Sequence, residues 1–147
     1  MRSGVRILTM ADLICPYRAT LVIKSGFACP HADEVIRRGG SEYVCLQSTS
    51  HAVCTEVHEK SKQAYLQSQG LQDDLLSLPH STFVKIQFGC VLGLQTALGR
   101  DVAKIDDIGS LIASAVNQYQ NIDSFPFELL NEKISGYKAQ KRSRRNT

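Results

Sequence analysis

Four stretches of the chain carry apolar residues at the spacing of amphipathic helices. Apolar side chains recur every three or four positions in residues 53–65, 83–98, 108–119 and 127–137. This period puts them on one side of a helix, where a neighbouring element can bury them. Asp106 or Asp107 is suited to cap the third helix, and Pro126 fits the first turn of a last helix that begins at Ser124. The pattern therefore predicts about four helices.

Residues 83–98 differ from the other three segments because they are apolar on nearly every side. A helix of this kind is expected at the centre of a domain. Gly89 and Gly93 lie four positions apart and present a smooth patch that another backbone can approach closely. The polar residues Lys85 and Gln87 distinguish this segment from a membrane-spanning helix. We interpret the patch as tight helix packing inside the domain or as the seam of a homo-oligomer.

The N-terminal third has shorter segments with the composition of strands. Residues 14–24 are rich in β-branched and aromatic side chains, and residues 42–47 form a second run of this type. Between them, residues 31–38 suggest one or two helical turns that stop at a pair of glycines. The expected fold class is α+β and mostly helical, with a small N-terminal β element of two short strands packed with about four helices.

Length and charge predict one globular domain with a distinct tail. The 147 residues suit a flexible leader at 1–10, a single domain at 11–137 and a basic, disordered tail at 138–147. The net charge of +3 arises in that tail, which holds five basic residues and no acid. Because basic and aromatic residues are not interleaved elsewhere, we do not expect nucleic-acid binding.

The chain shows neither a secretory signal nor an apolar run of about 20 residues, so we expect a cytoplasmic protein that does not enter a membrane. In a reducing compartment the five cysteines are expected to be free thiols. The remaining question is what these thiols do.

Four of the five cysteines lie in the first 54 residues, with the spacing C-x13-C-x15-C-x8-C: Cys15, Cys29, Cys45 and Cys54. Four thiolates can hold a tetrahedral zinc ion or an iron–sulfur cluster. The predicted strand ends and helix start are able to meet at one edge of the β element. Cys54 falls in the first turn of the predicted helix 51–67, where the helix dipole favours thiolate. We prefer an iron–sulfur cluster on all four cysteines as the cofactor.

Three alternatives stay open at this point. Zinc sites usually contain paired ligands a few residues apart, and only two such pairs occur here. These pairs permit a mixed metal set made of Cys29, Cys45, Cys54 and His58. Cys15 or His31 can replace one member of this set. The cysteines can also be plain buried residues. Finally, Cys54 can be a reactive thiol with His58 as its base one turn later, whereas His51 is expected to face solvent.

Three stretches resemble a family of short proteobacterial proteins without an assigned function. They are "FACPHADEVIRRGG" (27–40), "CLQSTSHAVC" (45–54) and "LPHSTFVKIQFGCVLGLQ" (78–95), the last being of the type PHSxxVKIQFGxxLGLQ. The resemblance covers residues 12–98. It implies a small bacterial accessory protein and transfers no catalytic or binding residue.

Two functional hypotheses follow. No phosphate-binding glycine loop or nucleophile elbow is present, so no catalytic residue is predicted. The first hypothesis is a small metal-binding accessory protein that transfers electrons to a redox partner protein through an iron–sulfur cluster, or holds zinc. The second is a helical, homo-oligomeric interaction protein without a cofactor.

Overall fold

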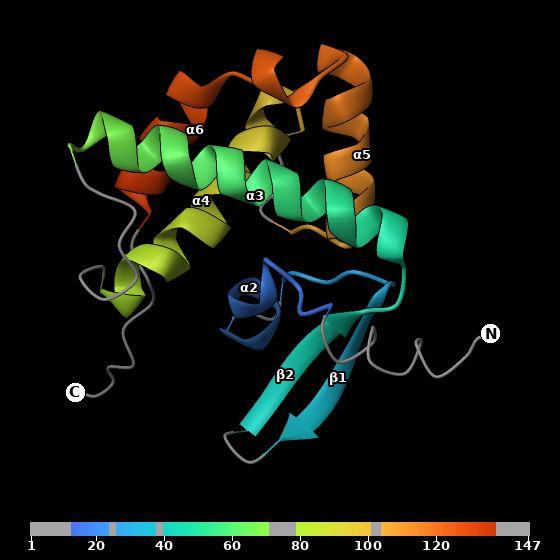
Figure 1. Cartoon of the computed structure of the whole chain (residues 1–147). Helices are drawn as coiled ribbons and strands as arrows, with labels where there is room; N and C mark the ends of the chain where they lie inside the picture. The colour runs from blue at the N-terminus through green and yellow to red at the C-terminus, as the bar shows by residue number, and fades with distance from the viewer. Residues whose placement is uncertain (1–12, 24–25, 38–39, 71–78, 101–103, 138–147) are drawn as a thin grey trace.

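The mostly helical α+β class is confirmed by the computed structural model, which describes residues 13–23, 26–37, 40–70, 79–100 and 104–137 (Figure 1). The expected leader 1–10 and tail 138–147 lie outside these ranges. In chain order the elements are α2 (Arg18–Ile23), β1 (Ala32–Arg37), β2 (Gly40–Cys45), α3 (Ser48–Ser68), α4 (His80–Ala97), α5 (Ile108–Tyr119), the 3-10 turn η1 (Ile122–Ser124) and α6 (Phe127–Gly136).

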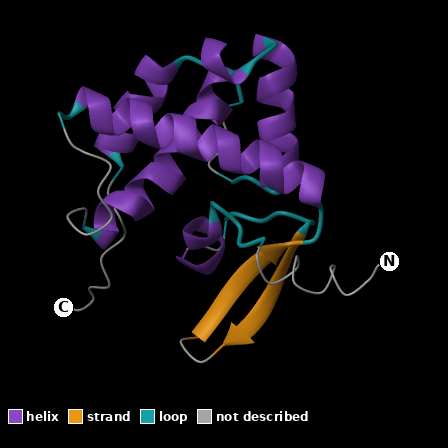
Figure 2. Ribbon diagram, viewed as in Figure 1, coloured by secondary structure: helices purple, strands orange, loops and turns teal. Residues whose placement is uncertain are grey.

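The four long helices pack together with α4 among them, and the hairpin β1–β2 extends away from this group next to the short helix α2 (Figures 1 and 2). Helix α4 packs against α2, α3, α5 and α6. All four predicted helices are present. In the described ranges, no helix is both long and apolar enough to span a lipid bilayer.

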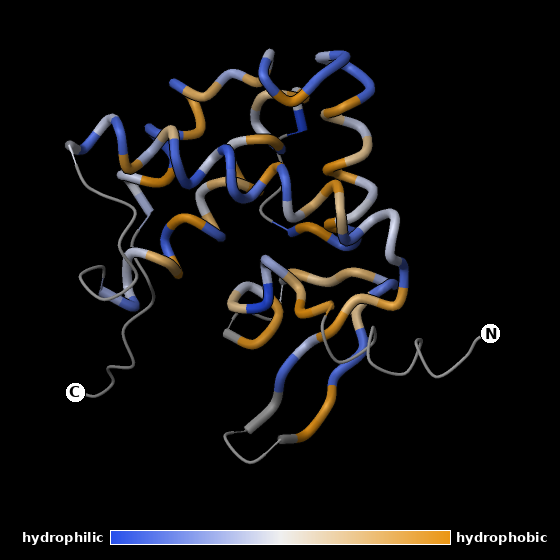
Figure 3. The backbone as a smooth tube through the Cα atoms, viewed as in Figure 1, coloured by the Kyte–Doolittle hydropathy of each residue, from blue (hydrophilic) through white to orange (hydrophobic). Residues whose placement is uncertain are grey.

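Helix α4 is the centre of the core, as its apolar circumference predicts. Ile86, Phe88, Val91 and Leu94 are fully buried, and the orange, hydrophobic parts of the tube in Figure 3 turn largely toward the interior between the helices. The Phe88 ring stacks on Tyr137, with ring centroids 4.6 Å apart. Burial of several large apolar side chains, at about 1.5–3 kcal/mol each, makes this helix a main source of stability.

The glycine patch on α4 packs against α6 within the same chain. A Cβ atom built on Gly89 would lie 2.4 Å from the Cα atom of Ile134, and one on Gly93 would lie 2.5 Å from a methyl group of Leu130. Close packing inside the domain is therefore the role the structure gives these glycines. The hypothesis of a homo-oligomer loses the exposed seam on which it was based.

The prediction of helical turns over residues 31–38 is wrong. Residues Ala32–Arg37 form β1, which pairs antiparallel with β2 so that Ala32 lies opposite Cys45 and Arg37 opposite Gly40. Gly40, one of the two glycines that resembled a helix stop, instead begins β2. A segment this short holds too few turns for its period to separate a helix from a strand.

The prediction of a strand over residues 14–24 holds only at its start. Ile14 forms a β-bridge with Val44, but Arg18–Ile23 fold into α2. Tertiary contacts override the strand propensity of this β-branched run: Tyr17 and Thr20 are completely buried, and the backbone N–H of Ala19 donates to Gln87 Oε1 of α4 at 2.7 Å.

The helix boundaries near the C-terminus were predicted in part. Asp107 caps α5, since its Oδ1 atom accepts from the N–H of Ser110 at 2.9 Å. The last helix begins at Phe127, three residues later than predicted, because Ser124 belongs to the separate 3-10 turn η1.

Replacing Gln120 with glycine is expected to stabilise the protein. Gln120 ends α5 with φ at 74°, a left-handed conformation that costs a residue with a Cβ atom about 1 kcal/mol and costs glycine little. Gln120→Gly should raise the free energy of unfolding by about 1 kcal/mol in urea titrations. Gln118 lies on the exposed side of the same helix, and Gln118→Gly should lower the free energy of unfolding by a similar amount. Equal effects of both changes would contradict the explanation.

Candidate functional site

Four cysteines from separate segments line one small cavity of about 20 Å³. Cys15 lies just before α2, Cys29 in the loop before β1, Cys45 at the end of β2 and Cys54 in α3. The other residues of its wall are Pro16, Tyr17, Ala32, Ser50, His51 and Ile108. A cavity of this volume has room for about one water molecule. We call these ten residues the thiol site.

Backbone hydrogen bonds bring the four segments together. The N–H of Cys15 donates to Tyr43 O at 2.9 Å, and the N–H of Cys45 donates to Leu13 O at 2.7 Å, so these two cysteines lie on paired chains. The N–H of Leu46 donates to His31 O at 2.8 Å, which ties the Cys29 loop to the end of β2. These bonds fix three of the four thiols independently of any ligand.

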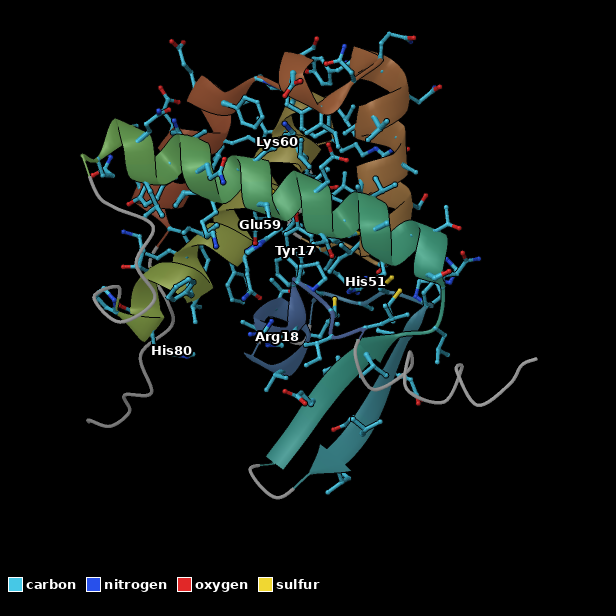
Figure 4. The ribbon with its side chains drawn as sticks, in the orientation of Figure 1. Tyr17, Arg18, His51, Glu59, Lys60 and His80 are labelled. Atoms are coloured by element: carbon cyan, nitrogen blue, oxygen red, sulfur yellow. The ribbon has the colours of Figure 1, made fainter. Side chains whose placement is uncertain are left out.

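Helix α3 contributes the fourth thiol together with two polar neighbours. Ser50 donates a hydrogen bond to the Cys54 thiol, and His51 Nε2 lies 3.0 Å from Ile14 O. His51 is therefore half-buried in the wall of the thiol site, and the prediction that it faces solvent is wrong. In Figure 4 yellow sulfur atoms lie close to the labelled His51, near the start of α3.

A glycine gives the Cys29 loop space at the start of α5. A Cβ atom on Gly109 would lie 3.2 Å from Ser50 Oγ and 3.5 Å from both Cys29 Sγ and the His31 ring. The role of Gly109 could not be predicted from the sequence, because the Cys29 loop that it contacts is about 80 positions away in the chain.

All the thiols described are free, and three of the four at the site are buried. Burial is the main cause that raises the pKa of Cys15 to about 11 and that of Cys54 to about 12. The helix dipole was expected to lower the pKa of Cys54. Because α3 begins at Ser48, Cys54 lies in the second turn, and desolvation outweighs the dipole.

The electrostatic coupling of the thiols supports their proximity. The charges of Cys29 and Cys45 act on Cys15, and those of Cys15, Cys29 and Cys45 act on Cys54, each raising the pKa of the affected thiol. A thiolate at one of these positions therefore disfavours ionisation of its neighbours, and a cation at the site would relieve this repulsion.

The thiol site does not have the arrangement of a single-ion centre. Among the residues that the structure describes, no three His, Cys, Asp or Glu side chains are placed so that they could hold one metal ion. A tetrahedral zinc with bonds of about 2.3 Å brings its sulfur atoms to roughly 4 Å from one another. The thiols therefore surround a common space without yet meeting at one point.

The two histidines of the alternative ligand sets lie outside the thiol site. His58 shares a face of α3 with Cys54, but its ring packs edge-on against the Tyr17 ring, with centroids 5.5 Å apart, and lines another groove. His31 lies beyond Gly109 in a groove between α3 and α5. Neither ring belongs to the wall that the four cysteines share.

The reactive-thiol alternative has unfavourable energetics. Burial lowers the pKa of His58 to about 4, whereas it raises that of Cys54 to about 12. Proton transfer from this thiol to this imidazole would create two charges that the site disfavours. The structure therefore offers no activated nucleophile at Cys54.

Cys90 is separate from the other thiols and does not line their cavity. It is completely buried in α4, where its Sγ atom lies 3.3 Å from Tyr17 Oη and donates to Ser61 Oγ at 3.3 Å. Tyr17 thus separates the thiol site from Cys90. The sequence held no signal for this role of Tyr17.

No protein-family model, curated protein or solved structure matches the chain. The site is therefore interpreted from its own residues.

Proposed function

We propose that the protein is a small cytoplasmic accessory protein that binds an iron–sulfur cluster through Cys15, Cys29, Cys45 and Cys54 and exchanges electrons with a redox partner protein. The observation that carries the proposal is the wall of the thiol site. Four cysteines, spread over 40 positions of sequence, line one cavity. Four soft sulfur ligands of this kind are the usual set for such a cluster, and the chemistry would be that of the metal.

A cluster suits the spread of the thiols better than zinc does. Zinc requires all four sulfur atoms to move inward to one ion. A cluster contains iron and sulfide atoms between its ligands, so its cysteines stay farther apart. The groove between α3 and α5, which shares Ser50 and Cys54 with the thiol site, provides space for such a centre on that side.

Purification without oxygen should yield a brown protein that contains iron and acid-labile sulfide. Each of the variants Cys15→Ser, Cys29→Ser, Cys45→Ser and Cys54→Ser should lose most of the visible absorbance, because a hydroxyl is a poor ligand for these metals. Cys90→Ala should keep it, since Cys90 lies outside the thiol site. Circular dichroism of each variant separates loss of the centre from loss of the fold.

Metal analysis of the same samples decides between the two centres. A colourless protein that contains one equivalent of zinc would show that the centre is zinc and not a cluster. In that case the four site variants should lose the zinc and Cys90→Ala should keep it. Absence of iron, sulfide and zinc from a folded, anaerobically purified protein would end the proposal.

A further inference from the structure

A large groove lies between α2, α3 and α4. Its volume is about 850 Å³, within the range of small-molecule sites. In Figure 4 the labelled residues Arg18, Glu59 and His80 come from the three helices that border it. We call it the His58 groove, after the histidine in its wall.

The His58 imidazole is buried without a full set of partners. The residue is 9% exposed, and its Nε2 atom has no hydrogen-bond partner within the described part of the chain. Buried polar atoms of this kind are rare in native proteins and indicate a missing partner. The Nδ1 atom lies 3.8 Å from Glu59 Oε2, which favours the proton on Nδ1. Nε2 is then an acceptor, and its missing partner is a donor.

Cationic side chains accompany this acceptor in the same walls. Arg18 is exposed, and one of its guanidinium nitrogens donates to Cys15 O at 3.3 Å. A guanidinium has five N–H donors, so it is able to bind a carboxylate as well. Lys62 is buried beside Glu59 at 3.3 Å and lies over the Phe83 ring. The groove thus combines the two cationic side chains with two acidic ones, Glu42 and Glu59, and with apolar surface from Val22 and Phe83.

We propose that the His58 groove binds a small carboxylic acid that also carries a hydrogen-bond donor, the class of the amino acids and hydroxy acids. Arg18 binds the carboxylate, and the His58 ring turns toward the groove so that Nε2 accepts from the ammonium or hydroxyl group. Glu59 favours this donor and disfavours a second carboxylate. The inference does not depend on a metal. Pro16 and His51 line both the groove and the thiol site, so the ligand would lie beside it.

Isothermal titration calorimetry of the 147-residue chain tests the proposal with glycine, L-serine, L-lactate, glycolate and acetate as probes. At least one amino or hydroxy acid should bind at least ten-fold more tightly than acetate, which lacks the donor. Binding by glycine and serine, or by lactate and glycolate, identifies the donor as ammonium or hydroxyl. The absence of heat from all the probes at millimolar concentration would overturn the proposal.

Matched variants assign the interaction to the groove. Arg18→Gln should weaken binding by about ten-fold or more, the loss of one charge-assisted contact. Arg100→Gln, an exposed arginine near Ser114 and outside the groove, should have no effect. His58→Phe keeps an aromatic ring but removes the acceptor, and should weaken serine or lactate binding to the level of acetate. Equal effects of the two arginine variants, or unchanged binding by His58→Phe, would place the ligand elsewhere.

Discussion

Replacing Gly89 with alanine should lower the free energy of unfolding by about 2 kcal/mol or more, although alanine is the better helix former. The added Cβ atom would lie 2.4 Å from the Cα atom and 2.7 Å from the backbone nitrogen of Ile134. Backbone atoms cannot move aside as a flexible side chain does. Helices α4 and α6 would therefore have to separate, which would loosen the packing around Ile134 and Leu130, both completely buried.

Urea titrations of two further variants show whether the close approach is the cause. Gly136→Ala, near the end of α6, places its Cβ atom in open space and should leave stability unchanged or raise it by up to about 1 kcal/mol. Gly93→Ala should fall between the two, because its nearest contact is a methyl group of Leu130 that is able to turn away. If Gly89→Ala were as stable as the native chain, the two helices could not be packed as described.

The same helix shows why much of the fold could be predicted from the sequence. Residues 83–98 have apolar side chains on all sides over several turns, and a long period of this kind leaves one interpretation. Helices α3, α4 and α5 were predicted to within about three residues at each end. Long periodic segments contain enough positions to identify both the element and its buried face.

The short N-terminal elements could not be assigned in this way. The run of Thr20 to Ile23 has the composition of a strand, yet it forms part of α2. It does so because Tyr17 and Thr20 are buried in the folded protein. Residues Ala32–Arg37 have acids early and a base late, as a helix does, yet they pair with β2. For six residues, the partner in space decides the conformation and the local sequence does not.

The four cysteines line one cavity in spite of these errors, and a metal bound to them stays a prediction. Cys15 and Cys45 lie on paired chains, which places the first two strand ends as expected. What the sequence could not predict was the environment. Desolvation of a thiol depends on every side chain that surrounds it, so the direction of the pKa shift of Cys54 was expected with the wrong sign.

The metal-free protein should lose stability as the pH rises from about 9 to 11. Burial raises the pKa of Cys15 to about 11 and of Cys54 to about 12, above the value of 9.0 for an exposed thiol. In this range the unfolded chain releases protons that the folded chain keeps, so increasing pH favours unfolding. Each thiol contributes up to about 1.4 kcal/mol per pH unit, so the loss should be on the order of 2–4 kcal/mol at pH 11.

The double variant Cys15→Ala/Cys54→Ala identifies the source of this loss. Tyr17, Cys90 and Lys60, whose pKa values are also raised, titrate in both proteins. The difference between the two curves of unfolding free energy against pH therefore reports the two thiols together with their effect on the pKa of Tyr17. The variant's curve should be flatter above about pH 9, and parallel curves would show that these thiols are not protected in the folded state.

A metal at the thiol site must displace the same protons. Its apparent affinity should therefore rise with pH, and proton release on zinc addition to the native chain should exceed that of the double variant.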